Sequence, residues 1–516
     1  MKSLSHSGPI TISATELRPL LSKRRVFTII LLLGFFILTV RGGHDPDLWW
    51  HLRAGQYMAQ SHSVLHRDIF SYTKFGQTWI AHEWLSEVIM YLVYKRTSWA
   101  GLNLFFGLAT GGAFAITFFR CAGRPYVAAP IVLLGMMASS PAWGLRPQMF
   151  SVLLTAIFLL LLDRAENNSG LSGGIESPAR YRFLWLMAPL TILWVNLHAG
   201  YAIGLVLIGV TLAGWLLEVG LGLRAWEDVK APAKTLALVF VICLALVPLN
   251  PNGLRLYIYP LETLRAHGIQ DFIQEWASPN FHEVEFKPLL ALFLLSFLAL
   301  ALAGRRVRAA QLLMLVGTAY GALTAVRHVP IFAIVAVPIV CACLVGWMND
   351  QGWKWFKADD QSAAAGKLAL NVVLLLAMTG FMLFRFNYVV REQPSLEARY
   401  FPAGATAFLA QNQPPPNLFN YYDWGGYFIW KLYPKYRVFT DGRTDLYGDE
   451  LMEAFSHIAN ADDHTWRQRL EMFGVATVVV PPQSGLSRIL QYDSGWKKLY
   501  ENKQAVIFSR EHTGNR

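Results

Sequence analysis

A series of apolar runs that recurs from residue 26 to residue 383 constrains this chain more than any other feature. Each run holds roughly 14 to 19 residues, close to the length that a helix needs to cross a bilayer. We therefore expect a mostly α-helical fold, a polytopic transmembrane bundle of about eleven spans. The expected spans are residues 26–40, 101–119, 127–143, 149–162, 183–197, 201–219, 236–249, 289–303, 312–326, 331–348 and 368–383.

The basic residues predict the orientation of the bundle, because cytoplasmic loops carry an excess of lysine and arginine. The polar segment 1–25 ends in Lys23-Arg24-Arg25 and should be cytoplasmic. GRRVR at 304–308 is the clearest cytoplasmic loop. Strict alternation then makes 41–100 and 250–288 external loops and leaves the C-terminus outside.

Charge and cysteine content narrow the function classes. The net charge of +11 could attract nucleic acid, but basic loops of a membrane protein explain it, so we expect no nucleic-acid partner. The four cysteines lie in or beside apolar runs without the spacing of a metal site, and we interpret them as buried apolar residues without a disulfide framework. They are Cys121, Cys243, Cys341 and Cys343.

Residues 44–87, just after the first apolar run, carry the densest chemistry in the chain. Asp45-Pro46-Asp47 predicts a helix start, with Asp45 as the N-cap and Pro46 at the first helical position. Asp47 then lies in the first turn, and His51, four residues later, shares its face. Trp49 and Trp50 suit a membrane–water interface. The apolar stretch 84–94 is too short to span, so we expect a helix at the interface.

Under this topology, the unusual polar side chains all fall at or near the outer ends of the helices, where a shared outward-facing cavity would bring them together. Several also have structural interpretations: Arg146 and Arg327 could extend toward the membrane surface, and His198 could be a hydrogen-bonded interior residue. Asn250-Pro251-Asn252-Gly253 has the chemistry of a turn. The set comprises Asp45, Asp47, His51, His82, Glu83, Arg146, Gln148, Asn196, His198, Asn250, Asn252, Glu275, Arg327 and His328.

Residues 386–516 lack a spanning run and predict a C-terminal extracytoplasmic α/β domain, after a transmembrane domain at 26–385. We expect a strand, a tight Gly425-Gly426 turn and a short helix in 417–432. RVFTDGRTDLY at 437–447 predicts a buried strand that ends in a loop at Asp441-Gly442-Arg443. The ionisable residues of that segment could form a loop-stabilising ion pair or a substrate-facing edge: Asp441, Arg443 and Asp445. The other expected elements are an amphipathic helix at 449–473 and strands at 475–481 and 505–509.

Several motifs together resemble the GT-C superfamily of membrane glycosyltransferases. They are DPDLWWHLRAG, HEWLSE, RPQ, WVNLHAG, LNPNG, EWASP and the pair DWGGYFIW and DGRTDLYG. The likeness covers nearly the whole chain and is strongest to a bacterial group related to the protein-mannosyltransferase and aminoarabinose-transferase type. It implies a multi-pass protein of the bacterial cytoplasmic membrane, a polyprenyl-phosphate-linked sugar donor, transfer on the outer face and a catalytic carboxylate in the first external loop. Many relatives have an Asp-Glu pair there, whereas this chain has Asp45-Pro46-Asp47.

The resemblance implies a role for each candidate. An inverting transfer needs a carboxylate that accepts the proton of the acceptor hydroxyl, and we expect Asp47, with Asp45 as the second catalytic candidate. Arginines can stabilise the departing lipid phosphate, and the expected phosphate ligands are Arg146, Arg327 and His328. The remaining substrate-binding candidates are His51, His82, Glu83, His198, Asn252 and Glu275.

Three questions stay open at this level. The acceptor could be a glycan, a lipid or a protein. A divalent cation could lie between Asp45, Asp47 and a histidine, but no spacing is diagnostic of a metal site. The alternative function is that of a lipid or solute transporter, or of a non-catalytic membrane assembly protein with a GT-C-like body. A transporter more often has broken helices at matching places in two halves, and no internal repeat is evident.

Overall fold

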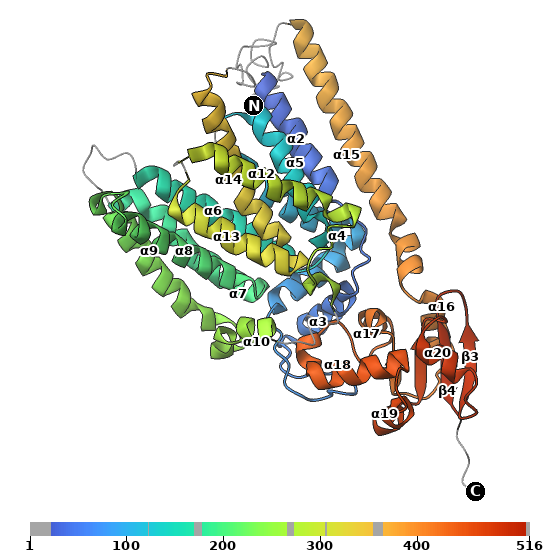
Figure 1. Ribbon diagram of the computed structural model, residues 1–516. Helices are drawn as coiled ribbons and strands as arrows, with labels where there is room; N and C mark the ends of the chain where they lie inside the picture. The colour runs from blue at the N-terminus through green and yellow to red at the C-terminus, as the bar shows by residue number, and fades with distance from the viewer. Residues whose placement is uncertain are drawn as a thin grey trace, which may run out of the picture.

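The computed structural model describes residues 22–121, 123–169, 178–265, 273–304, 307–353 and 365–511, which form a helical bundle joined to a C-terminal α/β unit (Figure 1). Within those ranges, eight helices are long and apolar enough to cross a membrane. The chain is therefore a multi-pass membrane protein. The eight are α4 (Trp84–Arg120), α5 (Pro125–Ser139), α6 (Gln148–Ser169), α8 (Tyr201–Gly220), α9 (Trp226–Leu246), α12 (Lys287–Ala303), α14 (Val329–Asp350) and α15 (Ala365–Tyr400).

The remaining predicted spans fall on shorter helices. These are α2 (Lys23–Thr39), α7 (Met187–Leu197) with the preceding 3-10 turns η2 (Pro178–Leu186), and α13 (Ala309–Thr324). Every apolar run therefore forms helix, which confirms the predicted fold class, while the number of crossings stays a prediction. Most of segment 1–25 and two arginines of the 304–308 loop lie outside the described residues.

A break inside α4 separates the short apolar stretch at 84–94 from the long run that follows it. Ser98 has φ 52° and ψ −144°, which no helical residue adopts, so residues on either side form two helices with different directions. The predicted short helix is thus distinct from the span at 101–119.

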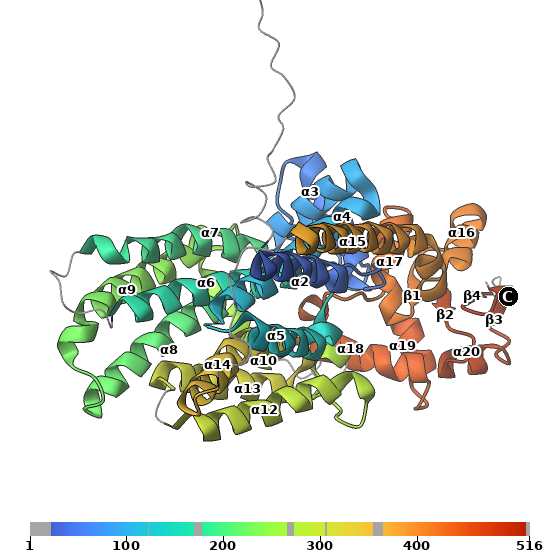
Figure 2. The ribbon, with the colours of Figure 1, turned by 90° about the horizontal axis from the view of Figure 1, so that it is seen from above.

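Burial distinguishes the middle of the bundle from its edge. Helix α14 is buried along almost its whole length, and it packs against α5, α12 and α13. Helix α15 lies at the edge beside α2 and exposes a row of large apolar side chains (Figures 1 and 2). A helix that is apolar all round suits either position in a membrane protein, since lipid solvates it as well as a protein core does.

The C-terminal unit contains a four-stranded sheet in the order β1-β2-β4-β3. Strand β1 (Leu418–Asn420) pairs in parallel with β2 (Thr477–Val480), and β4 (Val506–Arg510) pairs antiparallel with β2 and with β3 (Trp496–Glu501). The helices of the unit are α16 (Ala403–Asn412), α17 (Gly425–Leu432), α18 (Thr444–Asn460), α19 (Trp466–Met472) and α20 (Gly485–Leu490). Because α15 runs without a break to Tyr400, the predicted boundary at residue 385 lies within a helix.

Three predictions for this unit are wrong, and one strand was not predicted. The single helix expected at 449–473 is divided into α18 and α19. Gly425-Gly426 is the first turn of α17, not a tight turn, and a side chain at Gly426 would clash with the Pro46 carbonyl. The glycines therefore serve close helix packing. Residues 437–447 do not form a strand of the sheet. Val438 makes only isolated bridges, and α18 already begins at Thr444. Strand β3 was not predicted, since its residues are partly exposed and polar.

The segment at residues 44–87 packs against the C-terminal unit. Trp49 and Trp50, predicted to anchor at the membrane interface, are instead buried in a core that includes Phe401, Tyr427 and Phe428. The helix that carries them is α3 (Asp47–Ser61). Further along, Ser71 bridges Val438. The loop that holds the catalytic candidates is thus positioned by the C-terminal unit.

Candidate active site

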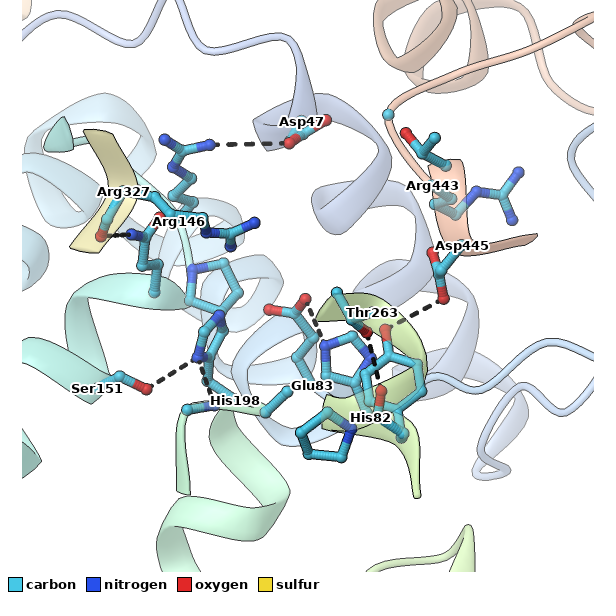
Figure 3. A pocket seen from close by; sticks show the side chains of 18 of the residues that line it. Asp47, His82, Glu83, Arg146, Ser151, His198, Thr263, Arg327, Arg443 and Asp445 are labelled. Atoms are coloured by element: carbon cyan, nitrogen blue, oxygen red, sulfur yellow. Dashed lines mark hydrogen bonds and ion pairs between the residues drawn. The ribbon is translucent and has the colours of Figure 1, made fainter. Parts of the chain in front are cut away.

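One cavity of about 270 Å³ lies where the bundle meets the C-terminal unit, and nine of the eleven predicted site residues line it (Figure 3). They come from segments far apart in the sequence, which supports the expectation that they share one cavity. The nine are Asp47, His51, His82, Glu83, Arg146, His198, Glu275, Arg327 and His328.

Helix ends supply most of these side chains. Arg146 lies in the link before α6, and His198 lies in the link between α7 and α8. Glu275 belongs to the 3-10 turn η5 (Gln274–Trp276), and Arg327 belongs to η8 (Val326–His328). Backbone that leaves a helix can direct polar side chains away from the apolar helix surface, so these ends can build a polar site over an apolar bundle.

A cationic group occupies one side of the cavity (Figure 3). Arg146 Nη2 donates a hydrogen bond to Glu275 Oε2, and Arg327 Nη1 lies 3.8 Å from the other oxygen of the same carboxylate. The Arg327 guanidinium also lies 4.3 Å from the centre of the Trp276 ring. Arg146 lowers the pKa of Glu275 although burial alone would raise it. Glu275 therefore holds two cations side by side.

The Asp47 carboxylate is held at both oxygens. Trp50 Nε1 donates to Oδ1 over 3.1 Å, and Arg146 Nη1 lies 3.9 Å from Oδ2. Helix α3 begins at Asp47, one residue later than predicted, and Asp45 Oδ1 accepts the Asp47 backbone N–H over 3.0 Å. A helix N-terminus by itself favours the ionised form of a carboxylate. Here burial and the nearby Asp45 outweigh that effect and raise the pKa of Asp47 to about 7.

The opposite side of the cavity is formed by polar side chains, with Arg443 and Asp445 of the C-terminal unit beside them (Figure 3). His82 Nε2 lies 3.0 Å from Glu83 Oε1, and the His82 ring packs on Tyr259 with 4.5 Å between ring centres. Tyr259 in turn donates to Asp445 Oδ2 over 3.1 Å. Burial alone raises the pKa of Glu83, but His82 outweighs this effect and holds it below the ordinary value. This wall offers several donors and acceptors within one small volume.

Two further histidines have defined partners. His51 Nδ1 lies 3.1 Å from Glu87 Oε1, and this contact raises the pKa of His51 although burial opposes it. His198 Nδ1 accepts the Gly200 N–H over 2.9 Å and lies 2.8 Å from Ser151 Oγ. Burial lowers the pKa of His198 to about 3, so it is neutral at physiological pH.

Two of the eleven predicted residues do not line the cavity. Asp45 lies behind it, with Oδ2 3.2 Å from Arg146 Nε; this contact is electrostatic, since it lacks hydrogen-bond geometry. Asn252 donates to Asn250 Oδ1 within the predicted turn. Asn250 itself donates to Val195 and His82 carbonyls, so the turn ties the loop to neighbouring segments.

Several lining residues were not predicted. Glu87 lies in the first turn of α4, four residues after its N-cap Glu83, a spacing that was visible in the sequence. Tyr259, Trp276 and Ser151 carry no such signal, since they enter the cavity only through packing between distant segments. Asp445 was considered either as part of an ion pair or as a substrate-facing residue, and it lines the cavity. Arg443 lines it too, while pairing with buried carboxylates.

Within the part of the chain that the structure describes, one group of three side chains has ligand atoms close enough to hold a metal ion: His457, Asp462 and Asp463. These residues follow one another around the C-terminal end of α18, outside the cavity. They are partly or fully exposed, and such groups are common without a metal.

No protein-family model matches the chain, and no curated protein matches it in sequence. Solved structures do match. The oligosaccharyltransferase of Archaeoglobus fulgidus in its apo form has a TM-score of 0.57 at 12% identity, covering 95% of this chain and 75% of that chain. AglB from the same organism, with an inhibitory peptide and a dolichol-phosphate, has a TM-score of 0.55 at 10% identity, covering 95% and 74%. ArnT from Cupriavidus metallidurans in the apo state has a TM-score of 0.52 at 13% identity, covering 94% and 97%.

These likenesses extend over nearly the whole chain, including the C-terminal unit. The chain therefore has a GT-C-like fold, as its motifs predicted. At such low identity the likeness concerns the fold, and the function has to be argued from the site.

Proposed function

We propose that this protein is a membrane glycosyltransferase that moves a sugar from a polyprenyl-phosphate-linked donor to an acceptor on the outer face of the cytoplasmic membrane. The observation that carries the proposal is a single cavity that holds a carboxylate, Asp47, beside two arginines, Arg146 and Arg327. A base and a cationic leaving-group site within one cavity are what such a transfer needs. The fold supports the proposal as an analogy.

The chemistry follows from these groups. The acceptor hydroxyl oxygen attacks the anomeric carbon, and the bond from that carbon to the phosphate oxygen breaks. Asp47 takes the hydroxyl proton as the new bond forms, and the polyprenyl phosphate leaves with the electron pair. Attack on the side opposite the leaving group inverts the configuration at the anomeric carbon. The cationic side stabilises the phosphate charge that develops during this step.

Arg327 is the primary candidate for contact with that phosphate. Its Nη1 is 3.8 Å from Glu275, longer than a hydrogen bond, so the guanidinium keeps donors for a ligand. The Trp276 ring supports one face of the guanidinium and orients it. Arg146 lines the same side, donates to Glu275 and adds positive charge, and His328 lines this side too.

The opposite wall suits the sugar. His82, Glu83, Tyr259 and Asp445 offer hydrogen-bond donors and acceptors, and a sugar presents hydroxyl groups that both give and accept hydrogen bonds. With the phosphate at Arg327 and the sugar on this wall, the anomeric carbon would lie between them, within reach of Asp47. The acceptor would then enter from the exposed side of Asp47, whose side chain is 28% exposed.

Replacing Arg327 with lysine should weaken donor binding about tenfold or more. Lysine keeps the charge but loses the planar fork that binds phosphate through two hydrogen bonds, and it stacks less well on Trp276. Binding of a fluorescent polyprenyl phosphate to purified protein measures the effect.

Arg437→Lys is the matched control, because that guanidinium lies 4.2 Å from the Phe75 ring centre but does not line the cavity. It should bind the lipid as wild type does. Wild-type affinity in Arg327→Lys would remove Arg327 from the phosphate site.

The proposal also requires the cavity to face outward, with the N-terminus in the cytoplasm. Reporter fusions after Arg308 and after Arg516 should report the cytoplasm and the exterior, respectively, because basic loops stay inside. A periplasmic phosphatase and a cytoplasmic fluorescent protein, fused in parallel at each site, give opposite signals. The reverse pattern at either site would place the cavity on the wrong face for a lipid-linked donor.

The transporter alternative predicted a different arrangement of charges. Charged residues of a transporter cluster near the middle of the membrane between matching halves. Here Asp47 and Arg327 line one cavity, formed at the ends of helices and covered by the C-terminal unit. This arrangement favours the transferase.

A further inference from the structure

Arg146 lies at the centre of three carboxylates, which come from two distant segments of the chain. Its Nε is 3.2 Å from Asp45 Oδ2, its Nη1 is 3.9 Å from Asp47 Oδ2, and its Nη2 donates to Glu275 Oε2. All three guanidinium nitrogens therefore face a carboxylate. The side chains are mostly buried, with exposures of 14% for Asp45, 15% for Arg146 and 17% for Glu275.

We propose that the Arg146 guanidinium is a built-in cation that takes the position of a divalent metal ion, so that this site works without one. The proposal rests on the proposed function, and it makes Arg146 a positioning residue that orients Asp47. Under this proposal, no divalent ion lies between Asp45 and Asp47, a possibility that the sequence left open.

The carboxylates do not fit an added ion. Magnesium and calcium need several oxygen ligands at about 2.0 to 2.6 Å. Here each carboxylate oxygen already faces another partner. Asp45 accepts from the Asp47 N–H and faces Arg146, while Asp47 accepts from Trp50 and faces Arg146. Glu275 uses one oxygen for Arg146 and the other for Arg327. An ion that used these oxygens would have to share them with the two guanidiniums, the Trp50 N–H and the Asp47 N–H.

Backbone also closes in on the group from two directions. A side chain at Gly144 would come within 2.6 Å of Asp45 Oδ2 and 3.2 Å of Arg146 Nε. A side chain at Gly442, contributed by the C-terminal unit, would clash with Asp47 Oδ1. Magnesium usually keeps several of its waters in a protein site. The glycine backbones leave little room for that shell beside Asp45 and Asp47.

Charge leads to the same conclusion. Arg146 and Arg327 together offset the charge of two of the three carboxylates. A divalent ion placed beside two guanidiniums would be repelled by both. A fixed guanidinium also has a mechanistic use, since it orients Asp47 permanently and needs no metal uptake.

The first test is transfer by the wild-type protein after exhaustive treatment with EDTA. The rate should stay within twofold of the untreated rate, and added Mg²⁺ or Mn²⁺ should not raise it. Loss of transfer on chelation, with recovery on adding either ion, would overturn the proposal. Arg146→Lys keeps one charge but cannot reach three carboxylates, so its rate should fall at least tenfold, mainly in kcat.

The second test measures Mn²⁺ binding directly, so it does not depend on an assay for sugar transfer. It uses a His457→Ala background, which removes a ligand of the exposed group on the C-terminal unit. The otherwise wild-type protein should bind no Mn²⁺ at the cavity. A Mn²⁺ site there that Glu275→Gln abolishes would contradict the proposal.

Removing the guanidinium should have the opposite effect. Arg146→Ala leaves the three carboxylates without their shared cation, so this variant should gain a Mn²⁺ site that Glu275→Gln removes again. A folded Arg146→Ala protein that binds no Mn²⁺ at the cavity would contradict the proposal that the guanidinium takes the position of the ion. If transfer fails under all conditions while the Mn²⁺ results hold, the proposed function is wrong and the built-in cation stands.

Discussion

Asp47→Asn should reduce transfer by about a hundredfold to ten-thousandfold, the usual contribution of a general base. Asparagine keeps the shape and still accepts from Trp50, but it cannot take the acceptor proton. Expression and donor binding should be normal, because the phosphate ligands are unchanged. Turnover of a labelled donor by the purified variant measures the loss.

Asp45→Asn should be milder, with a loss of about tenfold. Its remaining oxygen can still accept the Asp47 N–H at the start of α3, but the charge that faces Arg146 is gone. If the two substitutions behave the other way round, the roles of the carboxylates are exchanged. If neither slows turnover, the base is not in this loop. Asp493→Asn, outside the cavity, serves as the control.

The same carboxylate predicts the pH dependence of transfer. Burial and Asp45 raise the pKa of Asp47 to about 7, and only the ionised form accepts a proton. The rate should therefore rise with pH up to about 7 and level off above it. Because Asp45 contributes to the raised pKa of Asp47, Asp45→Asn should move the rising part of the pH–rate profile to lower pH. A wild-type rate that is flat from pH 5 to 8 would argue against Asp47 as the base.

Arg443→Met should cause the largest loss of stability. The guanidinium is almost fully buried and pairs with Asp68 of the segment 44–87 and with Asp441 of the C-terminal unit, at 2.8 and 2.7 Å. Methionine would leave both carboxylates buried without their cation, which costs about 3–5 kcal/mol. The variant should therefore unfold at a markedly lower temperature, measured by the thermal midpoint in detergent, and should lose transfer because the loop with Asp47 is no longer held.

The matched control for this effect is Arg510→Met, which removes an exposed pair with Glu471 on the same unit. Exposed pairs contribute about 0–1 kcal/mol, so its thermal midpoint should stay close to wild type. Equal midpoints for the two variants would mean that the Arg443 group does not join the loop to the C-terminal unit.

Much of the fold was predictable because its main signals are local. Apolar runs predict spans by length alone, and strands β2 and β4 are visible as short, continuously buried segments. The errors arose where packing between distant segments decides the structure. Trp49 and Trp50 have interfacial chemistry, yet the C-terminal unit covers them. Gly425-Gly426 has turn chemistry, yet it allows α17 to approach the start of α3.

The same distinction between local signals and long-range packing applies to the candidate site. The prediction that the polar residues gather at one end of the bundle needed only the order of the spans. Which residues touch was not predictable, because contacts such as Arg146 with Glu275 join segments more than a hundred residues apart. The role of Arg146 changed accordingly. Expected to bind the donor phosphate, it faces three carboxylates, which leaves Arg327 as the more accessible cation.

The central claim is tested most directly by following a lipid-linked sugar. Purified protein in lipid nanodiscs is incubated with a panel of polyprenyl-phosphate sugars labelled in the sugar, with a cell-envelope fraction as the acceptor. The account predicts that wild type converts at least one donor to free polyprenyl phosphate and moves its label to the acceptor, and that Asp47→Asn does neither. Donors that all stay intact with wild type, or that Asp47→Asn consumes at the wild-type rate, would contradict it.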